Sequence, residues 1–546
     1  MFHRKIAVFT VAAVCICVFF AAGPLPAQSR GLKAISAKDL KVHMDLLASP
    51  VFEGRPSPST AVEIASLYLA QQAAKRGLKP ILPDGAYLQP IPVEVTALSP
   101  AKSRLRVLSP GGEQVLYFPQ SFAPTSIRMT VDGAFSGGIV FVGAARDADE
   151  KSLEKVDVRG KMAVAVGLTL PEAARPAAGT PPPFSLTRYL REKGAAGLIT
   201  IITPEREKNL SENRLNFDIA ERLAFPSVDM SGRGSSAAAP AGAAGAPTIP
   251  FIQLDVRHDA GAAILGIMPA EMEARIDAAA KGGRLAPGPV EGRSLEASLY
   301  FDTRETVTSN IVGVIEGSDP KLKREYVTIT GHQDHLSMRE GSVYPGADDN
   351  ASGAVAMLEI IEALMIERPK RSVIFVWSTA EERGLVGAYY FVQHCPVPVE
   401  KISANLNLDM LSRNDPNMVY FVGSNCLSTE FDQILRAAMK RSVGLRIDDL
   451  YQNPAHADRF FFRSDQVPHI QYGIPGVWIF SGTTPDYHTS RDTVERMDFA
   501  KFEKLTKFAY VACLDIGNRP EMMKLDVRPD VTARGAHNMK VNWRAR

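Results

Sequence analysis

Five residues in the C-terminal half of the chain have side chains that bind metal ions, and each lies in its own short motif. They are His332 in TGHQDHL, Asp349 in PGADDNASG, Glu382 in STAEERG, Asp409 in LNLDM and His488 in PDYHTSRDT. Two imidazoles and three carboxylates suit a pair of Zn²⁺ ions, because zinc accepts both nitrogen and oxygen ligands. A carboxylate shared by two metals about 3.5–4 Å apart, with water at the open positions, is typical of hydrolytic enzymes. The pattern therefore predicts a two-zinc hydrolase.

Glu381 and Asp334 lie next to these ligands in the sequence, and their positions predict that they assist the metal site. Glu381 precedes Glu382, and adjacent side chains project in different directions, so one is free to face substrate as a general base. Two like charges at the end of a buried strand are costly unless metals neutralise them, which favours this interpretation over a simple helix-dipole effect. Asp334 lies two residues after His332 in an extended stretch and points the same way, so it is expected to hold the second ring nitrogen.

Each motif taken alone also has a simpler explanation. Asp349 and its neighbours are good N-caps for the following helix. Asp409 ends a buried run, where either a metal or an arginine would satisfy it. A loop histidine such as His488 is usually just exposed. Motifs for a serine triad, a phosphate-binding loop, a dinucleotide fold or an HExxH zinc site are absent. Three further histidines lack comparable placement and are predicted not to bind metal: His335, His456 and His469.

Strand-like and helix-like segments alternate through the region that carries the ligands. The expected strands are 309–314, 326–330, 372–377, 404–409, 418–422 and 477–481, and the clearest helices are 353–367 and 429–441. This alternation predicts an α/β fold with a mostly parallel central sheet and helices on both faces. Four of the five ligands fall at or just after a predicted strand end, where such folds build their sites.

The chain before this region has a more mixed organisation. Helices are expected at 37–48, 60–76 and 185–193, and strands at 93–97, 105–108, 137–142, 160–166, 197–202 and 251–254. A Ser/Ala/Gly/Pro tract at 231–246 predicts a surface loop, and 283–293 resembles a linker. At 546 residues the chain exceeds the usual size of one core, which predicts two domains.

The N-terminus has the pattern of a secretory signal. A basic start at 1–5 precedes an apolar run at 6–22 and small residues up to Ala27, which predicts a cleaved signal peptide over 1–27, with an uncleaved anchor as the alternative. The prediction is therefore an extracytoplasmic protein, periplasmic or secreted, without stable membrane insertion after cleavage. Three cysteines remain, and an odd, sparse set forms no disulfide framework: Cys395, Cys426 and Cys513. A formal charge of +2 without basic runs argues against a nucleic-acid partner.

The motifs HQD, GADDN, AEE, LDM and DYH, in that order, resemble the di-zinc aminopeptidase family. That family includes bacterial leucyl-type aminopeptidases, glutamate carboxypeptidase II and, as a non-catalytic relative, transferrin receptor. The resemblance covers about 309–516, and Phe52-Glu-Gly-Arg55 is similar to the family's N-terminal segment. One departure is Gln333, where the family commonly has tyrosine in HYDH.

The resemblance implies a role for each site residue. Asp349 would bridge two zinc ions, with His332 and Asp409 on one and Glu382 and His488 on the other. Glu381 would be the general base that activates a zinc-bound hydroxide, with Asp334 as the partner of His332. A cis peptide after the bridging aspartate is expected. Further residues that match the family pattern are expected to shape the substrate pocket: Tyr487, Asp465 and Arg463.

The resemblance also implies the domain organisation. The segment 133–295 is similar to the protease-associated domain that many members insert, with cues in GGIVFVG, VDVRGKMAVAV and GAAGLITI. The expected order is a signal peptide over 1–27, an N-terminal part of the peptidase domain over 28–132, the inserted domain, the catalytic domain over 296–520 and a tail over 521–546.

The expected activity is zinc-dependent aminopeptidase action on peptides. Three alternatives share parts of the pattern: a glutaminyl cyclase relative with one zinc, a carboxypeptidase or dipeptidase, and a non-catalytic receptor-like module. Retention of all five ligands and Glu381 argues against the receptor-like alternative. The sequence leaves the side-chain preference and homo-oligomer formation open.

Overall fold

The computed structural model describes residues 30–125, 132–168, 184–204, 221–229, 251–338, 342–454, 456 and 458–528. The predicted signal peptide over 1–27 and the predicted loop over 231–246 lie outside these residues. Among the described helices, none is both long enough and apolar enough to cross a membrane.

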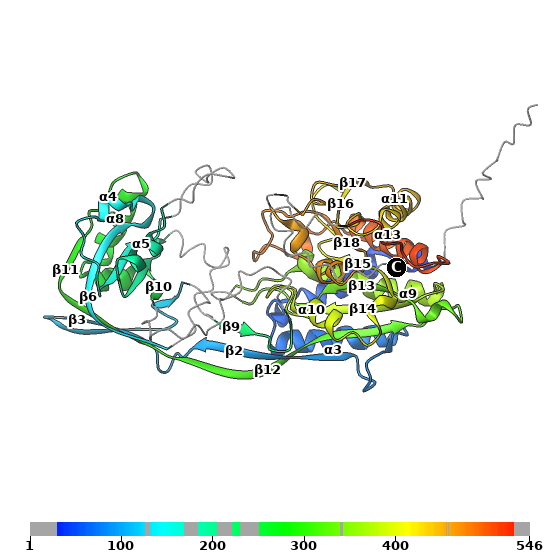
Figure 1. The fold of residues 1–546 in the computed structure, drawn as a ribbon, viewed down its shortest axis with the longest axis horizontal. Helices are drawn as coiled ribbons and strands as arrows, with labels where there is room; N and C mark the ends of the chain where they lie inside the picture. The colour runs from blue at the N-terminus through cyan, green and yellow to red at the C-terminus, as the bar shows by residue number, and fades with distance from the viewer. Residues whose placement is uncertain are drawn as a thin grey trace, which may run out of the picture.

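The larger lobe contains a ten-stranded sheet in the order β17-β16-β18-β15-β13-β14-β12-β2-β9, with β1 paired to β12 (Figure 1). The neighbouring strands β14, β13, β15 and β18 run parallel, as predicted, whereas β12 and β16 pair with them antiparallel. The strands are β1 Lys79–Pro80, β2 Leu88–Leu98, β9 Glu221–Ala224, β12 Phe301–Ile315, β13 Tyr326–His332, β14 Ser372–Ser378, β15 Ile402–Leu408, β16 Met418–Val422, β17 Arg446–Asp448 and β18 Gly476–Phe480.

Helices cover both faces of this sheet, so the larger lobe is a three-layer α/β fold. Along β14, Phe375 and Trp377 pack with one helical layer while Ile374 and Val376 pack with the other, as the two-residue period of a strand requires. The first layer consists of α1 Arg30–Ala34, α2 Ala37–Leu47, α3 Thr60–Lys75, α9 Gly353–Ile366 and α13 Phe499–Gly517, with α11 Thr429–Ser442 against α13. The second consists of α10 Val386–Gln393 and α12 Gln466–Gln471.

Local sequence explains where these helices lie. In α9 nearly every side chain is buried, which is expected of an apolar helix between the sheet and other helices. By contrast α11 is amphipathic, begins at the N-cap Ser428 and carries acidic residues in its first turn and basic residues in its last. The helices and strands expected in this lobe are present, but β2 and β12 begin five and eight residues earlier than the expected strands at 93–97 and 309–314.

The smaller lobe contains an eight-stranded sheet in the order β4-β3-β11-β6-β7-β8-β10-β5. Its strands are β3 Arg104–Ser109, β4 Gly112–Tyr117, β5 Phe122–Pro124, β6 Gly133–Ala144, β7 Met162–Val166, β8 Gly197–Ile201, β10 Ile252–Val256 and β11 Gly288–Leu299. Its helices are α4 Glu150–Leu153, α5 Leu186–Glu192, α7 His258–Leu265 and α8 Pro269–Ala280. Separate apolar clusters cover the two faces of this sheet.

The linker expected at 283–293 is partly wrong. Strand β11 begins at Gly288 and pairs with β3 and β6, with an irregularity between Pro289 and Ser294. The Gly and Pro residues that suggested a linker lie at this irregular start of the strand.

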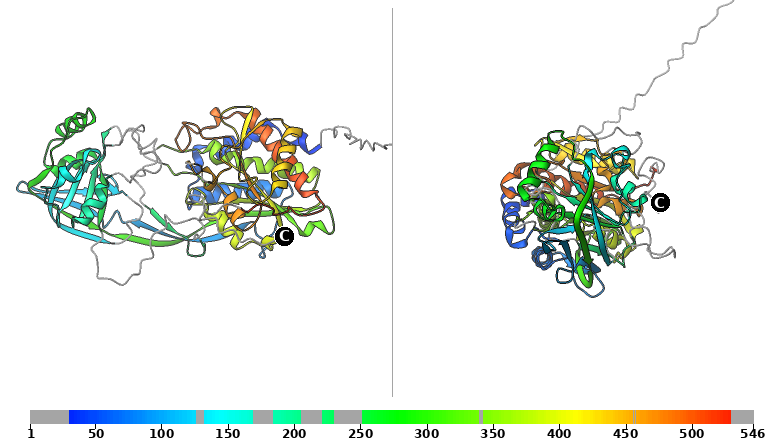
Figure 2. Two further views of the ribbon diagram at one scale, coloured as in Figure 1. Left: turned by 45° about the horizontal axis from the view of Figure 1, so that its top comes forward. Right: turned by 90° about the vertical axis from the view of Figure 1, so that its left-hand side faces the viewer.

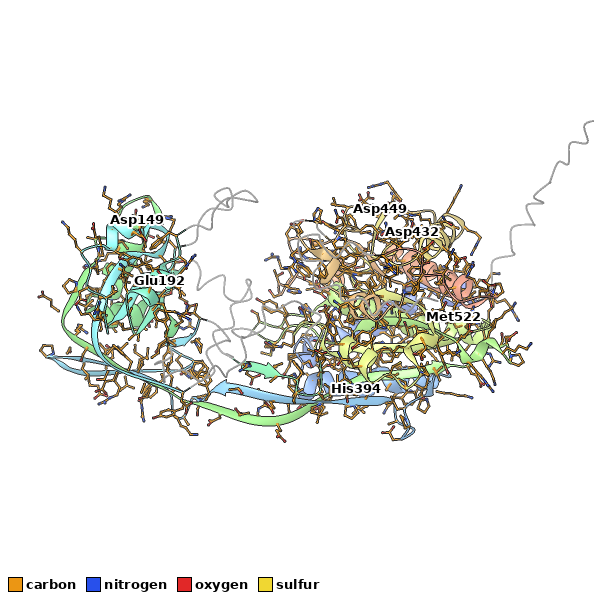
Figure 3. All side chains as sticks on the ribbon, in the orientation of Figure 1. Asp149, Glu192, His394, Asp432, Asp449 and Met522 are labelled. Atoms are coloured by element: carbon orange, nitrogen blue, oxygen red, sulfur yellow. The ribbon has the colours of Figure 1, made fainter. Side chains whose placement is uncertain are left out.

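Strands β2 and β12 join the two lobes as a long antiparallel pair (Figures 1 and 2). Their register runs from Leu98 opposite Phe301 to Leu88 opposite Ile311. The residues labelled in Figure 3 show the two lobes apart, with Asp149 and Glu192 on the smaller lobe and His394 and Asp432 on the larger. The loops at the carboxyl ends of β13, β14, β15 and β18 therefore belong to the larger lobe alone.

Candidate metal centre

The carboxylate of Asp349 lies between two groups of side chains, with one oxygen toward each. Oδ1 is 3.3 Å from Nε2 of His332, and Oδ2 is 2.9 Å from Nε2 of His488. His332 Nε2 is also 3.5 Å from Oδ1 of Asp409, and His488 Nε2 is 3.0 Å from Oε1 of Glu382. The structure thus brings all five sequence-predicted ligands into two groups that share Asp349.

The donor set and its spacing fit a pair of zinc ions. Zinc–ligand bonds of about 2.0–2.2 Å place neighbouring ligand atoms of a tetrahedral site about 3.3–3.5 Å apart. The distances above lie within about half an ångström of that range. Oε1 of Glu382 and Oδ1 of Asp409 are buried and accept no hydrogen bond within the described part of the chain. Buried carboxylate oxygens normally have partners, so these two atoms suit a bound cation.

His332 is the last residue of β13, and the main chain orients its ring. Nδ1 donates to the main-chain oxygen of Asp334 at 3.0 Å, which leaves Nε2 directed at Asp349 and Asp409. The Asp334 carboxylate, predicted to hold this ring, is 3.8 Å away and instead accepts the N–H of Glu381 at 3.1 Å. Burial raises the pKa of Asp334 to about 7. The main-chain oxygen of Asp334 therefore orients His332, while its carboxylate holds the main chain of Glu381.

Asp349 is not a helix cap. Its backbone dihedrals, φ −106° and ψ 95°, are non-helical, and the peptide bond to Asn350 is cis, as the resemblance implied. The side chain of Asn350 accepts the N–H of Gly353 and so makes the hydrogen bond expected of a cap. Asp492 accepts the N–H groups of both Asp348 and Asp349. These contacts leave the Asp349 carboxylate facing the two histidines.

The simpler explanations for Asp409, an arginine partner, and for His488, an exposed loop position, do not hold. Asp409 follows β15 and accepts a hydrogen bond from Ser464, and no arginine forms an ion pair with it among the described residues. His488 lies in the loop after β18 but is only 7% exposed. Both side chains are therefore held inside the site rather than satisfied elsewhere.

Glu381 belongs to neither group and faces the adjoining cavity. Its Oε2 is 3.9 Å from Nε2 of His332. Ala380, with φ +53°, turns the chain sharply after β14, so Glu381 and Glu382 point in different directions. Burial, together with the neighbouring Glu382, raises the pKa of Glu381 well above its usual value.

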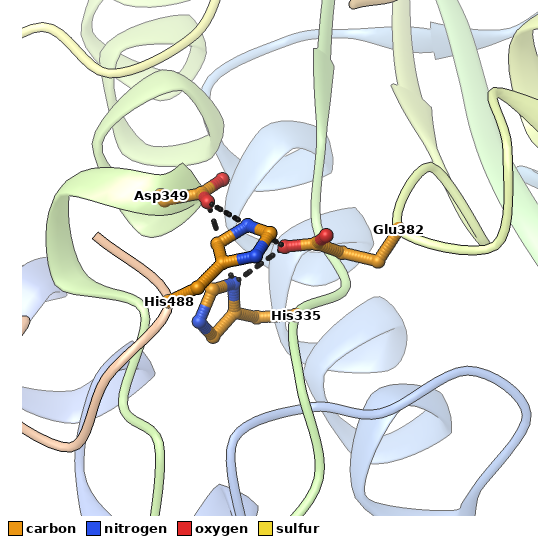
Figure 4. A group of neighbouring side chains, drawn as sticks. All are labelled: His335, Asp349, Glu382 and His488. Atoms are coloured by element: carbon orange, nitrogen blue, oxygen red, sulfur yellow. Dashed lines mark ion pairs between the residues drawn. The ribbon is translucent and has the colours of Figure 1, made fainter. Parts of the chain in front are cut away.

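His335 was predicted not to bind metal, but the structure places its ring beside the second group of ligands. Its Nδ1 lies 2.9 Å from Oε1 of Glu382, within the group that contains Asp349 and His488 (Figure 4). Strand β13 ends at His332, so the alternation that would direct a residue three positions later away no longer applies. The sequence did contain a sign of this position, because His335 follows the strand-end ligand His332 by only three residues.

The cavity beside the site opens to solvent, with about 260 Å³ of space including its open mouth, and has an aromatic wall that the sequence did not indicate. Met410, Phe460, Trp478 and Phe480 line it with the metal-binding groups. Tyr487, predicted to shape the pocket, also lines it and stacks on His488, with ring centroids 3.8 Å apart. Arg463 lines it as well, with its guanidinium over the Phe460 ring.

Asp465 was predicted to shape the substrate pocket, but it lies behind the cavity wall. It is fully buried, accepts a hydrogen bond from Ser378 and is not part of the cavity lining. The charges of the buried groups His332 and Asp409 act on its carboxylate. It therefore supports the site from behind and does not touch a molecule in the cavity.

An α/β fold with two histidines and three carboxylates gathered at adjacent strand ends defines a candidate hydrolytic metal centre. Residues 310–512 match peptidase family M28. The matched residues lie in the larger lobe and contain all five predicted ligands.

Curated relatives agree over the same region. The chain is 31% identical over 198 residues to a probable leucine aminopeptidase 2 of Aspergillus oryzae, covering 35% of this chain and 38% of that protein. It is 32% identical over 203 residues to an aminopeptidase of Pseudomonas aeruginosa, covering 34% of each. The matched segment thus spans little more than a third of these relatives.

Solved structures extend the likeness of fold to most of the chain. A zinc aminopeptidase from Bacillus subtilis superposes with a TM-score of 0.53 and 17% identity, covering 91% of this chain and 99% of that one. An aminopeptidase from an Aneurinibacillus species gives a TM-score of 0.51 and 16% identity, covering 92% of this chain and 100% of that one. At these identities the likeness is one of fold.

Proposed function

We propose that the protein is a zinc-dependent aminopeptidase with two Zn²⁺ ions bridged by Asp349. The observation that carries this proposal is the placement of the two Asp349 oxygens, one toward His332 and one toward His488. A carboxylate that meets two imidazoles in this way, at distances near those of zinc ligands, suits two ions and not one. The match of residues 310–512 to peptidase family M28 and the names of the curated relatives support peptide hydrolysis.

The chain's own residues divide the chemistry among them. When bound, Zn²⁺ would polarise a substrate carbonyl and lower the pKa of a water molecule. Glu381 lies at the cavity, where its carboxylate takes the proton from the attacking water and passes it to the leaving amine. The Asp334 carboxylate, through the N–H of Glu381, keeps this base in place. Tyr487 packs on His488 at the cavity edge and positions that imidazole.

The aromatic wall favours an apolar side chain on the residue that is released. Phe460, Trp478 and Phe480 present rings to the cavity, and Met410 adds a flexible apolar side chain. A charged side chain would lose its hydration against these rings, and Arg463, the cation that lines this cavity, already lies over the Phe460 ring. The protein should therefore prefer leucine-like residues over aspartate or glutamate at the N-terminus of its substrates.

The proposal also covers the domain type of the smaller lobe and the cellular location of the protein. We assign the smaller lobe as the inserted protease-associated domain and move its start from 133 to about 104, because β3 and β4 belong to its sheet. Its end lies near 300, between β11 and β12. An extracytoplasmic location follows from the apolar N-terminal segment.

The proposal is tested with a short peptide that begins with leucine and its N-acetylated twin. A site that binds a free amine leaves polar groups unpaired when the amine is blocked, so kcat/KM should fall by roughly 10²-fold or more for the acetylated peptide. Equal values for the two would reject aminopeptidase action. A third peptide that begins with glutamine, assayed for ammonia release, distinguishes cyclisation from hydrolysis.

A further inference from the structure

His335 is held rigidly in place by main-chain contacts. Its N–H donates to the carbonyl of Arg55 at 3.1 Å, and it forms an isolated parallel bridge with Pro56. Its ring packs against Gly346, where an added Cβ would come within 2.4 Å of the imidazole. The residue is 2% exposed. The ring therefore has little freedom to turn away from the site.

The imidazole points at the second group of metal-binding side chains. Nδ1 lies 2.9 Å from Oε1 of Glu382 and 3.8 Å from Oδ2 of Asp349. Neither ring nitrogen has a hydrogen bond of good geometry within the described part of the chain. The ring also meets His488 edge-on, with centroids 5.5 Å apart (Figure 4). A buried imidazole without a hydrogen-bond partner, directed at two carboxylates and a second imidazole, is placed as a metal ligand.

We propose that His335 is a fourth protein ligand of the metal ion held by Asp349, Glu382 and His488. This proposal rests on the two-metal function proposed above. The measured separations of Nδ1 from the two carboxylate oxygens, and of His488 Nε2 from the same oxygens, run from 2.9 to 3.8 Å. They bracket the spacing of about 3.3–3.5 Å expected between ligands of tetrahedral zinc.

A fourth protein ligand makes the two sites unequal. The site with two imidazoles and two carboxylates is closed by protein, as structural zinc sites are. The site of His332, Asp349 and Asp409 has three protein ligands, which leaves a position for water or substrate beside Glu381. The closed site should therefore bind zinc more tightly and fill first, while substrate binds at the open site.

Counting imidazoles in the zinc-loaded wild-type protein tests this assignment directly. X-ray absorption at the zinc edge should give about 1.5 imidazoles per zinc if three histidines share two ions, and about 1.0 if only His332 and His488 bind. Two zinc ions with about 1.0 imidazole each would overturn the role of His335 and leave the two-metal proposal intact. A protein that binds no zinc would reject both.

Two substitutions separate a ligand from a residue that only orients Glu382. His335→Asn retains an N–H near the position of Nδ1, so the close contact with Oε1 of Glu382 is preserved while the zinc ligand is lost. We expect it to lower the affinity of the tighter site by more than the roughly 10–100-fold that loss of an outer-shell partner costs, as should His335→Ala, in competition with a chromophoric chelator. Wild-type affinity in His335→Asn would overturn the proposal.

The matched control is His394→Asn, because His394 is the C-cap of α10 on the larger lobe (Figure 3) and belongs neither to the metal-binding groups nor to the cavity lining. This variant should bind zinc as the wild type does. Thermal unfolding of the metal-free proteins checks that each variant folds. A variant that does not fold leaves the imidazole count of the wild type as the deciding measurement.

Discussion

Arg55 offers a sharp test of how the N-terminal segment supports the site. Its guanidinium is fully buried and donates to four main-chain carbonyls, those of Leu47, Gln333, Pro345 and Gly346, at 2.8–2.9 Å. Burial lowers its pKa to about 10, so it stays charged at neutral pH. It thus connects α2 to the loops that precede Asp334 and Asp348.

The cost of Arg55→Lys follows from these contacts. Lysine keeps the charge, but its compact ammonium cannot reproduce the planar fork. Gly346 also accepts the N–H of Ala351, so we expect two of the other three carbonyls to lose their donor. Each buried carbonyl left unpaired costs about 1–3 kcal/mol, which gives a loss of about 2–6 kcal/mol in the free energy of unfolding. That is a large part of the stability of about 5–15 kcal/mol typical of proteins.

Urea unfolding of the metal-free protein measures this loss, followed separately by fluorescence and circular dichroism because the chain has two lobes. Arg304→Lys is the matched control, since Arg304 is exposed on β12 and its ion pair with Glu221 spans 3.5 Å. We expect the control to change stability by less than about 0.5 kcal/mol. If Arg55→Lys also stays within about 1 kcal/mol of the wild type, the four hydrogen bonds do not stabilise the fold as argued.

Three further predictions concern single carboxyl groups. Glu381→Gln should lower kcat by roughly 10²-fold or more with unchanged zinc content, because it removes the base but no ligand; retained activity in a steady-state assay would reject the role. Asp492→Asn removes one of the acceptors that hold the N–H groups of Asp348 and Asp349, so urea unfolding should show a loss of about 1–3 kcal/mol, and no loss would contradict it. Burial raises the pKa of Glu359 to about 7, so its contribution to stability is complete below about pH 4 and is lost as the pH rises through 7. Glu359→Gln should therefore gain about 1–3 kcal/mol over the wild type between pH 5 and about 8, and equal pH profiles would refute this.

Local patterns in the sequence were enough to predict most of the larger lobe. The apolar run of β14 and the helical patterns of α3 and α11 depend on residues close together in the chain, and the structure has these elements where they were expected. The proximity of the five ligands could also be predicted from their positions along the chain. Side chains at the carboxyl ends of neighbouring parallel strands meet at one edge of a sheet, so their positions along the chain implied their proximity.

Other features depend on contacts between distant segments, which no local pattern records. His335 faces the metal-binding groups because Arg55 and Pro56, almost three hundred residues earlier, hold its main chain. The aromatic wall combines Phe460 with β18, and their rings look like ordinary core residues in the sequence. By itself, the sequence determined which side chains could bind metal and which elements carry them. Only the tertiary structure decided which of these side chains point inward together, because burial and orientation are set by packing across the whole lobe.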